Sequence, residues 1–131
     1  MKKAISLLLS LSLMVFILYP TPAEAMEEPL PRYSSMSSIS QSVYKSGNGV
    51  TCYYNARAYS NVTKIVATCT LYEMKNGSYV YVDSWSNTHD TFYGYAESYR
   101  STSGGSCMFV ATYTTYINGV YQERISVTRY T

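Results

Sequence analysis

Few side chains in this 131-residue sequence could act as nucleophiles, acids or bases: three cysteines, one histidine and eight carboxylates. Cys52, Cys69 and Cys107 each alternate with apolar residues along a β-like run, so we expect all three to face a core. His89 stands beside Asp90 in a polar loop. A nucleophilic thiol needs an exposed setting and a base within reach, so this pattern gives little support to a cysteine–histidine pair. We predict no catalytic residues.

Known catalytic and cofactor motifs are also missing. The sequence has no glycine-rich phosphate loop, no G-x-S-x-G elbow, no H-E-x-x-H and no C-x-x-C. One histidine and core-facing thiols leave few side chains that could bind a metal ion. Two carboxylates could serve glycoside hydrolysis, but no spacing singles out a pair among Glu73, Asp83, Asp90, Glu97 and Glu123. We therefore expect no metal, no cofactor and no enzymatic activity.

The cysteines could instead form a disulfide, and their odd number leaves at least one thiol unpaired in a monomer. In an immunoglobulin-like arrangement Cys52 would lie on the second strand and Cys107 on the sixth, which face each other across the core. We predict a Cys52–Cys107 disulfide. The alternatives are Cys69–Cys107, Cys52–Cys69 and three free buried thiols. The Tyr-x-Cys corner of immunoglobulin domains is absent, because residue 105 is Gly105.

Aromatic side chains are the remaining candidates for molecular recognition, since the sequence holds 16 tyrosines, 3 phenylalanines and 1 tryptophan. An Asn76-Gly77 turn fixes a register that gathers four aromatics on one face of a hairpin, opposite Leu71, Val80 and Val82. Exposed Tyr and Trp bind proteins and stack on sugars, although cross-strand pairing within a sheet is an alternative role. The predicted binding residues are Tyr72, Tyr79, Tyr81 and Trp85, with Tyr116 as an extension.

Strands must position these side chains. After the first residues Thr, Tyr, Val and Ile dominate, and no helix-length amphipathic stretch appears. The predicted strands cover 38–46, 50–59, 64–74, 79–86, 91–100, 106–117 and 120–130. Their count and spacing predict an all-β fold, a single antiparallel immunoglobulin-like or fibronectin-III-like β-sandwich of about seven strands. A small barrel is the alternative.

Three Asn-Gly dipeptides predict type I′ hairpin turns, because both central residues of that turn need positive φ. The turns at Asn76-Gly77 and Asn48-Gly49 bring apolar residues opposite apolar residues. The pairs are Tyr72–Tyr81, Leu71–Val82, Val43–Tyr54, Tyr44–Tyr53 and Ile39–Ala58. Around Asn118-Gly119, Val110 falls opposite Val127 but the faces are mixed. Either both faces are partly covered there or a bulge interrupts the ladder.

The first residues have the layout of a secretory signal peptide. Lys2 and Lys3 precede an apolar run over 4–19, and an A-x-A site ends at Ala25. The run is shorter than the ~20 residues that a spanning helix needs. We predict a cleaved signal helix over 1–25, a flexible leader over 26–37 and one domain over 38–131. The protein is then secreted, with no membrane contact after cleavage.

The charge balance narrows the class of partner. Charged residues make up 14 % of the chain and the net charge is +2, which argues against a nucleic-acid binder. A hydrophobic content of 47 % argues against a disordered tail. We expect a non-catalytic extracellular binding or structural module that presents an aromatic sheet face to a cell-wall glycan or a protein. The alternative is a secreted bacteriocin-like effector or inhibitor.

Strand and turn patterns recur at 63–65, 71–73, 76–80, 104–105 and 109–113. In these patterns residues 40–131 resemble a group of small secreted proteins of unknown function from Gram-positive, spore-former-type bacteria. The resemblance implies an exported β-sandwich and assigns no catalytic residues. The three cysteines depart from the pattern, in which Ser or aromatic residues are expected, and this bears against the disulfide.

Overall fold

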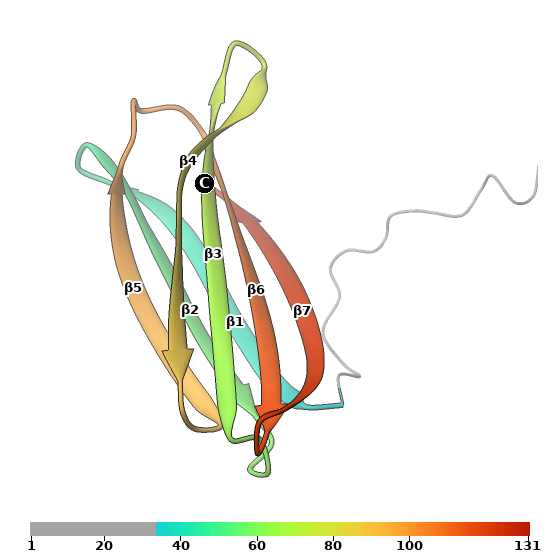
Figure 1. Cartoon of the computed structure of the whole chain (residues 1–131). Helices are drawn as coiled ribbons and strands as arrows, with labels where there is room; N and C mark the ends of the chain where they lie inside the picture. The colour runs from blue at the N-terminus through green and yellow to red at the C-terminus, as the bar shows by residue number, and fades with distance from the viewer. Residues whose placement is uncertain (1–33) are drawn as a thin grey trace, which may run out of the picture. The chain divides into compact units, whose positions relative to one another are not determined.

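The computed structural model describes residues 34–131, which form seven antiparallel strands in two sheets (Figure 1). The strands are β1 (Met36–Ser46), β2 (Gly49–Ala58), β3 (Lys64–Lys75), β4 (Ser78–His89), β5 (Tyr93–Ser101), β6 (Cys107–Ile117) and β7 (Val120–Tyr130). The predicted all-β sandwich is confirmed. None of the described residues forms a helix with the length and hydropathy needed to cross a membrane.

The two sheets have the strand orders β1-β2-β5 and β4-β3-β6-β7. In Figure 1 the four-stranded sheet lies in front of the three-stranded one. Alternate side chains of β2, β3 and β6 are buried between the sheets, as period-2 alternation requires. The largest fully buried side chains are Tyr54 and Tyr113.

The observed strands match the predicted ranges to within a few residues. β1 begins at Met36, inside the range assigned to the leader, and β4 continues to His89, beyond the predicted end at residue 86. The predicted signal segment over 1–25 and the first part of the leader lie outside the described residues.

The first hairpin turns one residue earlier than predicted. Ser46 pairs with Gly49, so the loop residues are Gly47 and Asn48. Gly47 has a φ of 58° and Asn48 has no positive φ. Glycine at the first loop position is what a type II′ turn requires. The predicted partners of Val43, Tyr44 and Ile39 are therefore wrong, and the observed ones are Cys52, Thr51 and Ala56. Because the error is two residues, each side chain keeps its predicted face.

The other two hairpins have the predicted type I′ turns, with positive φ at Asn76, Gly77, Asn118 and Gly119. A β-bulge follows each turn. Tyr72 pairs with Tyr81 as predicted, but the register then shifts and Leu71 faces Asp83 instead of Val82.

In the last hairpin the register shifts between Thr115 and Tyr116, so Val110 faces Thr128 instead of Val127. The bulge that the mixed faces indicated is confirmed.

Candidate binding surface

The five aromatic residues that were predicted to form a binding surface do not lie together in the fold. Tyr72 and Tyr81 lie opposite each other on the outer face of the four-stranded sheet, with ring centroids 6.5 Å apart in an edge-to-face contact. Tyr79 lies on the same face near the end of the sheet, 6.1 Å from Tyr130. These rings contact one another, which is the cross-strand role weighed above.

Trp85 is not on that face, and its prediction is wrong. It pairs with the buried Cys69, and its ring stacks on Phe109 with centroids 6.1 Å apart. The physical reason is the bulge at Leu71 and Tyr72, because one extra residue reverses the face of everything beyond it. Trp85 therefore packs against the core.

Tyr116 is on the outer face of the four-stranded sheet but at its opposite end. The ring centroids of Tyr116 and Tyr121 are 6.3 Å apart, and the Lys64 ammonium lies 4.5 Å from the centroid of the Tyr116 ring. Lys64 and Tyr72 are eight positions apart on β3, or ~27 Å along a strand. The five predicted residues do not form one patch.

A different surface gathers more tyrosines. The outer face of the three-stranded sheet carries five of them, which we call the tyrosine face: Tyr44, Tyr53, Tyr93, Tyr95 and Tyr99. Thr51 lies between Tyr44 and Tyr99, and Asn55 lies between Ser40 and Tyr95. Four of these five rings are largely exposed, with fractions of 48 % for Tyr44, 49 % for Tyr93, 69 % for Tyr95 and 47 % for Tyr99.

Most rings of the tyrosine face do not contact another aromatic ring. Within residues 34–131, no aromatic pair includes Tyr44, Tyr53, Tyr95 or Tyr99. Tyr93 is the exception, since it contacts Phe92 and the Arg57 guanidinium lies 5.4 Å from its ring. The remaining side chains on this face are hydroxyls, one amide and one charge of each sign. They are Ser38, Ser40, Ser42, Ser46, Thr51, Asn55, Arg57, Glu97 and Ser101.

One hydrogen bond between side chains links the two outer strands of this sheet, β1 and β5. Tyr44 donates its hydroxyl to Glu97 Oε2 at 3.2 Å across the sheet. The bond and the nearby carboxylate raise the pKa of Tyr44, so the phenol stays neutral. The tyrosine face is therefore a neutral aromatic surface with hydroxyls between the rings.

Sequence reasoning missed Tyr93, Tyr95 and Tyr99, although a signal was present. Between Tyr93 and Tyr99 large outward residues alternate with the small Gly94, Ala96 and Ser98. No Asn-Gly turn precedes this strand, and its partner β2 is not its neighbour in the chain. The alternation could have fixed the face of the strand, but not the sheet in which it lies.

The single histidine, His89, is hydrogen-bonded and packed within the fold. Asn87 donates to the Tyr54 hydroxyl oxygen at 3.1 Å, and the same hydroxyl shares a hydrogen bond of 2.7 Å with His89 Nε2. Burial lowers the pKa of His89, with a smaller opposing effect from Asp90. A Cβ at Gly94 would lie 2.2 Å from the imidazole, so glycine leaves the space for this ring. Neutral His89 is thus hydrogen-bonded at the edge of the core.

The three cysteines are free, buried thiols. The structure does not contain the predicted Cys52–Cys107 disulfide. Cys107 is the first residue of β6, opposite Glu73, and its thiol contacts the Gly105 carbonyl oxygen at 3.6 Å. It therefore lies at one end of the strand, whereas Cys69 pairs with Ala111 further along it. Burial raises the pKa of Cys52 to about 12 and of Cys69 to about 11.

Four of the five candidate carboxylates hold the fold together. Glu73 accepts backbone N–H groups of Ser103 and Gly105, the latter at 2.7 Å, and these bonds lower its pKa. Glu123 accepts the N–H of Ser35 at 2.7 Å, and Glu97 accepts from Tyr44.

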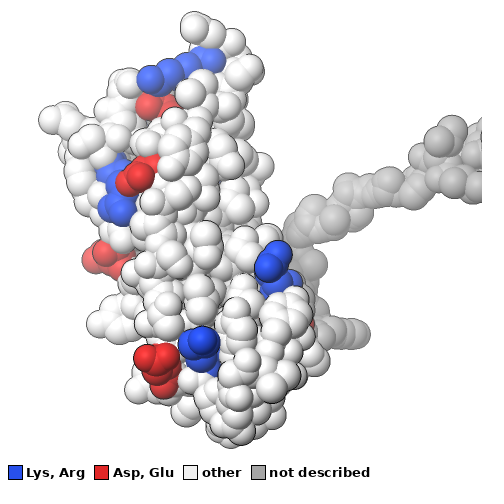
Figure 2. Space-filling model, in the orientation of Figure 1, with Lys and Arg blue, Asp and Glu red and all other residues white. Residues whose placement is uncertain are grey.

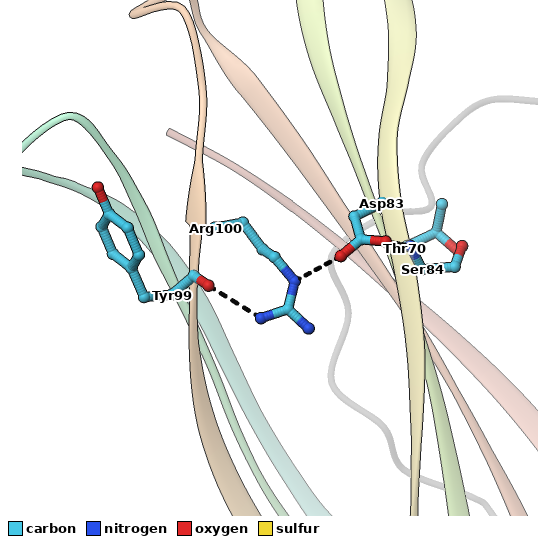
Figure 3. Close-up of polar contacts among 5 residues, drawn as sticks. All are labelled: Thr70, Asp83, Ser84, Tyr99 and Arg100. Atoms are coloured by element: carbon cyan, nitrogen blue, oxygen red, sulfur yellow. Dashed lines mark hydrogen bonds and ion pairs between the residues drawn. The ribbon is translucent and has the colours of Figure 1, made fainter.

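Asp83 forms an ion pair with Arg100 (Figure 3). The Arg100 guanidinium also lies 3.9 Å from the centroid of the Trp85 ring. Figure 3 also shows the Tyr99 ring pointing away from the Arg100 side chain. Arg100 therefore joins β5 to β4 while Tyr99 stays on the tyrosine face. Within residues 34–131, no three His, Cys, Asp or Glu side chains are close enough to share a metal ion.

Comparisons of this chain with protein-family models, with curated proteins and with solved structures found no match.

Proposed function

We propose that this protein is exported and acts outside the cell as a non-catalytic module that binds a neutral polysaccharide of the cell envelope. The tyrosine face is the proposed binding surface. The observation that carries the proposal is the presence of four tyrosines on one sheet face whose rings are not engaged with other aromatic rings of the described chain. Export is supported by the basic, apolar and A-x-A segments over 1–25.

The composition of the face favours a glycan over a protein partner. Protein interfaces are also rich in tyrosine, but their buried centre is apolar, whereas the outward positions of this sheet pair tyrosines with hydroxyls and include no aliphatic side chain. Tyrosine rings offer flat apolar surface to the C–H face of a sugar, and the hydroxyl and amide groups between them can hydrogen-bond its hydroxyls. Arg57 and Glu97 balance each other in charge, which suits an uncharged polymer.

We also propose that the sandwich is immunoglobulin-like. The first, second and fifth strands share one sheet, and the third, sixth and seventh share the other. The fourth strand lies beside the third, which differs from the constant-type immunoglobulin arrangement, where it joins the first sheet. This order supports the fibronectin-III-like variant.

Co-sedimentation with insoluble cellulose, chitin and β-glucan tests the binding function. We expect the protein to sediment with at least one of them, and a Tyr95→Ala, Tyr99→Ala double variant to lose about tenfold or more in affinity. A tenfold loss corresponds to about 1.4 kcal/mol of binding free energy.

The matched control is a Tyr81→Ala, Tyr121→Ala double variant, because these tyrosines are exposed by 59 % and 54 % on the other sheet. It should bind like the unaltered protein. An equal loss in both variants, or no loss in the first, overturns the proposal. Capture of a secreted protein through Tyr95 and Tyr99, with no glycan bound, would assign the face to a protein partner instead.

A further inference from the structure

The outer face of the four-stranded sheet contains a shallow hollow at its centre that is lined by hydroxyl groups and one arginine. The lining residues are Thr68, Thr112, Thr114, Arg124 and Ser126. They come from three adjacent strands, since Thr68 pairs with Thr112, Thr112 with Ser126, and Thr114 with Arg124. The register thus places several hydroxyls around one guanidinium.

Arg124 differs from the other arginines of the described chain. Arg57 lies over aromatic rings, Arg100 is paired with Asp83, and Arg129 donates to the Gln41 carbonyl oxygen. Within residues 34–131, Arg124 has no ion pair, no hydrogen-bond acceptor and no aromatic ring as a partner, and its side chain is exposed to solvent. A guanidinium carries five N–H donors that match the oxygens of a carboxylate or phosphate.

The surrounding face favours an anion. Its outward positions on the four strands include Lys64 and Arg124 but no Asp or Glu. Figure 2 shows this side of the molecule, with acidic atoms along its left margin and basic atoms on the opposite side as well. Glu123 precedes Arg124 but turns the other way, where it accepts the N–H of Ser35. An anion in the hollow would therefore meet positive charge without a neighbouring negative charge.

We propose that this hollow binds the oxyanion group of an acidic envelope polymer, a carboxylate or a phosphate. Arg124 forms the charged hydrogen bonds, and the hydroxyls of Thr68, Thr114 and Ser126 donate further ones. Thr112 and Ser126 already share a hydrogen bond of 2.8 Å, which orients the two hydroxyls at the floor of the hollow. Lys64 adds long-range attraction near the end of the sheet. This site is separate from the tyrosine face, which is on the opposite sheet.

Affinity electrophoresis of the protein in gels containing poly(galacturonate), poly(glycerol phosphate) or uncharged dextran tests the proposal. We expect one or both acidic polymers to retard the protein and dextran not to. Retardation by the first alone identifies a carboxylate ligand, and by the second alone a phosphate ligand. Arg124→Gln should weaken the interaction about tenfold. Lys75→Gln is the matched control, because it also removes one positive charge, but one that lies outside the hollow.

A loss of the same size in Lys75→Gln would mean non-specific attraction and would overturn the proposal. So would the absence of retardation by both acidic polymers. As a direct readout, inorganic phosphate should shift the NMR signal of the Arg124 Nε–H group before those of other arginines. Binding to neutral glycans should be unchanged in Arg124→Gln, so failure of this proposal and failure of the tyrosine-face function are distinguishable.

Discussion

At the scale of single residues, the free cysteines make a direct prediction. Burial raises the pKa of Cys52 to about 12 and of Cys69 to about 11, so thiolate is scarce at neutral pH. We expect a thiol reagent such as DTNB to react very slowly with the folded protein and to titrate three thiols after unfolding in urea. A count of one thiol in unfolded, unreduced protein would contradict the free state and indicate a disulfide.

His89 makes a second prediction, because it is the only histidine in the sequence. Burial lowers its pKa in the folded state below the ordinary value of 6.5. The folded state therefore disfavours the proton, so the contribution of His89 to stability is complete above pH 6.5 and is lost as the pH falls below that value. We expect the free energy of unfolding in urea to fall between about pH 7 and pH 5.5.

His89→Gln is the control for that pH dependence. Glutamine can still accept from the Tyr54 hydroxyl but does not titrate, so the slope over this range should flatten. Parallel slopes in the two proteins would refute the assignment. Glu73 gives no interference, because its pKa is lowered and its contribution is lost only below the ordinary carboxyl value of 4.5.

At the scale of strands, the edge between β4 and β5 depends on Arg100. Its guanidinium pairs with Asp83 at 2.7 Å and lies 3.9 Å from the Trp85 ring. Exposed ion pairs contribute about 0–1 kcal/mol and cation–π contacts about 0.5–2 kcal/mol. We predict that Asp83→Asn costs less stability in urea unfolding than Arg100→Met, because only the second removes both contacts. Equal costs, or the reverse order, would show that the ring contact adds no stability.

Strands and turns could be predicted from the sequence because they depend on local chemistry. Asn76-Gly77 and Asn118-Gly119 adopt the expected turns, and the strand ranges differ only at their ends. The first hairpin was placed two residues out of register because Gly47-Asn48 and Asn48-Gly49 are both good turn sequences. That error left each side chain on its predicted face of the sheet. The single extra residue of the bulge beside Leu71, in contrast, moved Trp85 to the other face. The faces of this hairpin were not mixed in the sequence pattern, unlike those of the last hairpin, so this bulge could not be foreseen.

At the scale of the whole molecule, the tyrosine face could not be predicted because it joins strands that are distant in the chain. Tyr53 on β2 and Tyr95 and Tyr99 on β5 share a sheet only through the β2–β5 pairing, which no local turn specifies. The count of 16 tyrosines was visible at once, but their division between core, cross-strand pairs and an exposed face depends on sheet order.

The two proposed surfaces belong to opposite sheets, and this makes the last prediction. The outer faces of two packed sheets point away from each other, and sites more than about 7–10 Å apart without shared partners act independently. If both proposals hold, one molecule should bind a neutral glycan and an acidic polymer together. We therefore expect the protein to carry soluble poly(galacturonate) or poly(glycerol phosphate) into the pellet of the insoluble glycan that it binds.

Variants at either face should abolish this bridging for different reasons. Tyr95→Ala with Tyr99→Ala should leave the protein and acidic polymer together in the supernatant. Arg124→Gln should sediment with the glycan but leave the acidic polymer behind. If saturation with one polymer instead displaced the other, the two ligands would be competing for one surface, and the assignment of separate binding sites to the two sheets would be wrong. Bridging needs no conformational change, because the rigid pairing of seven strands already holds the two faces apart.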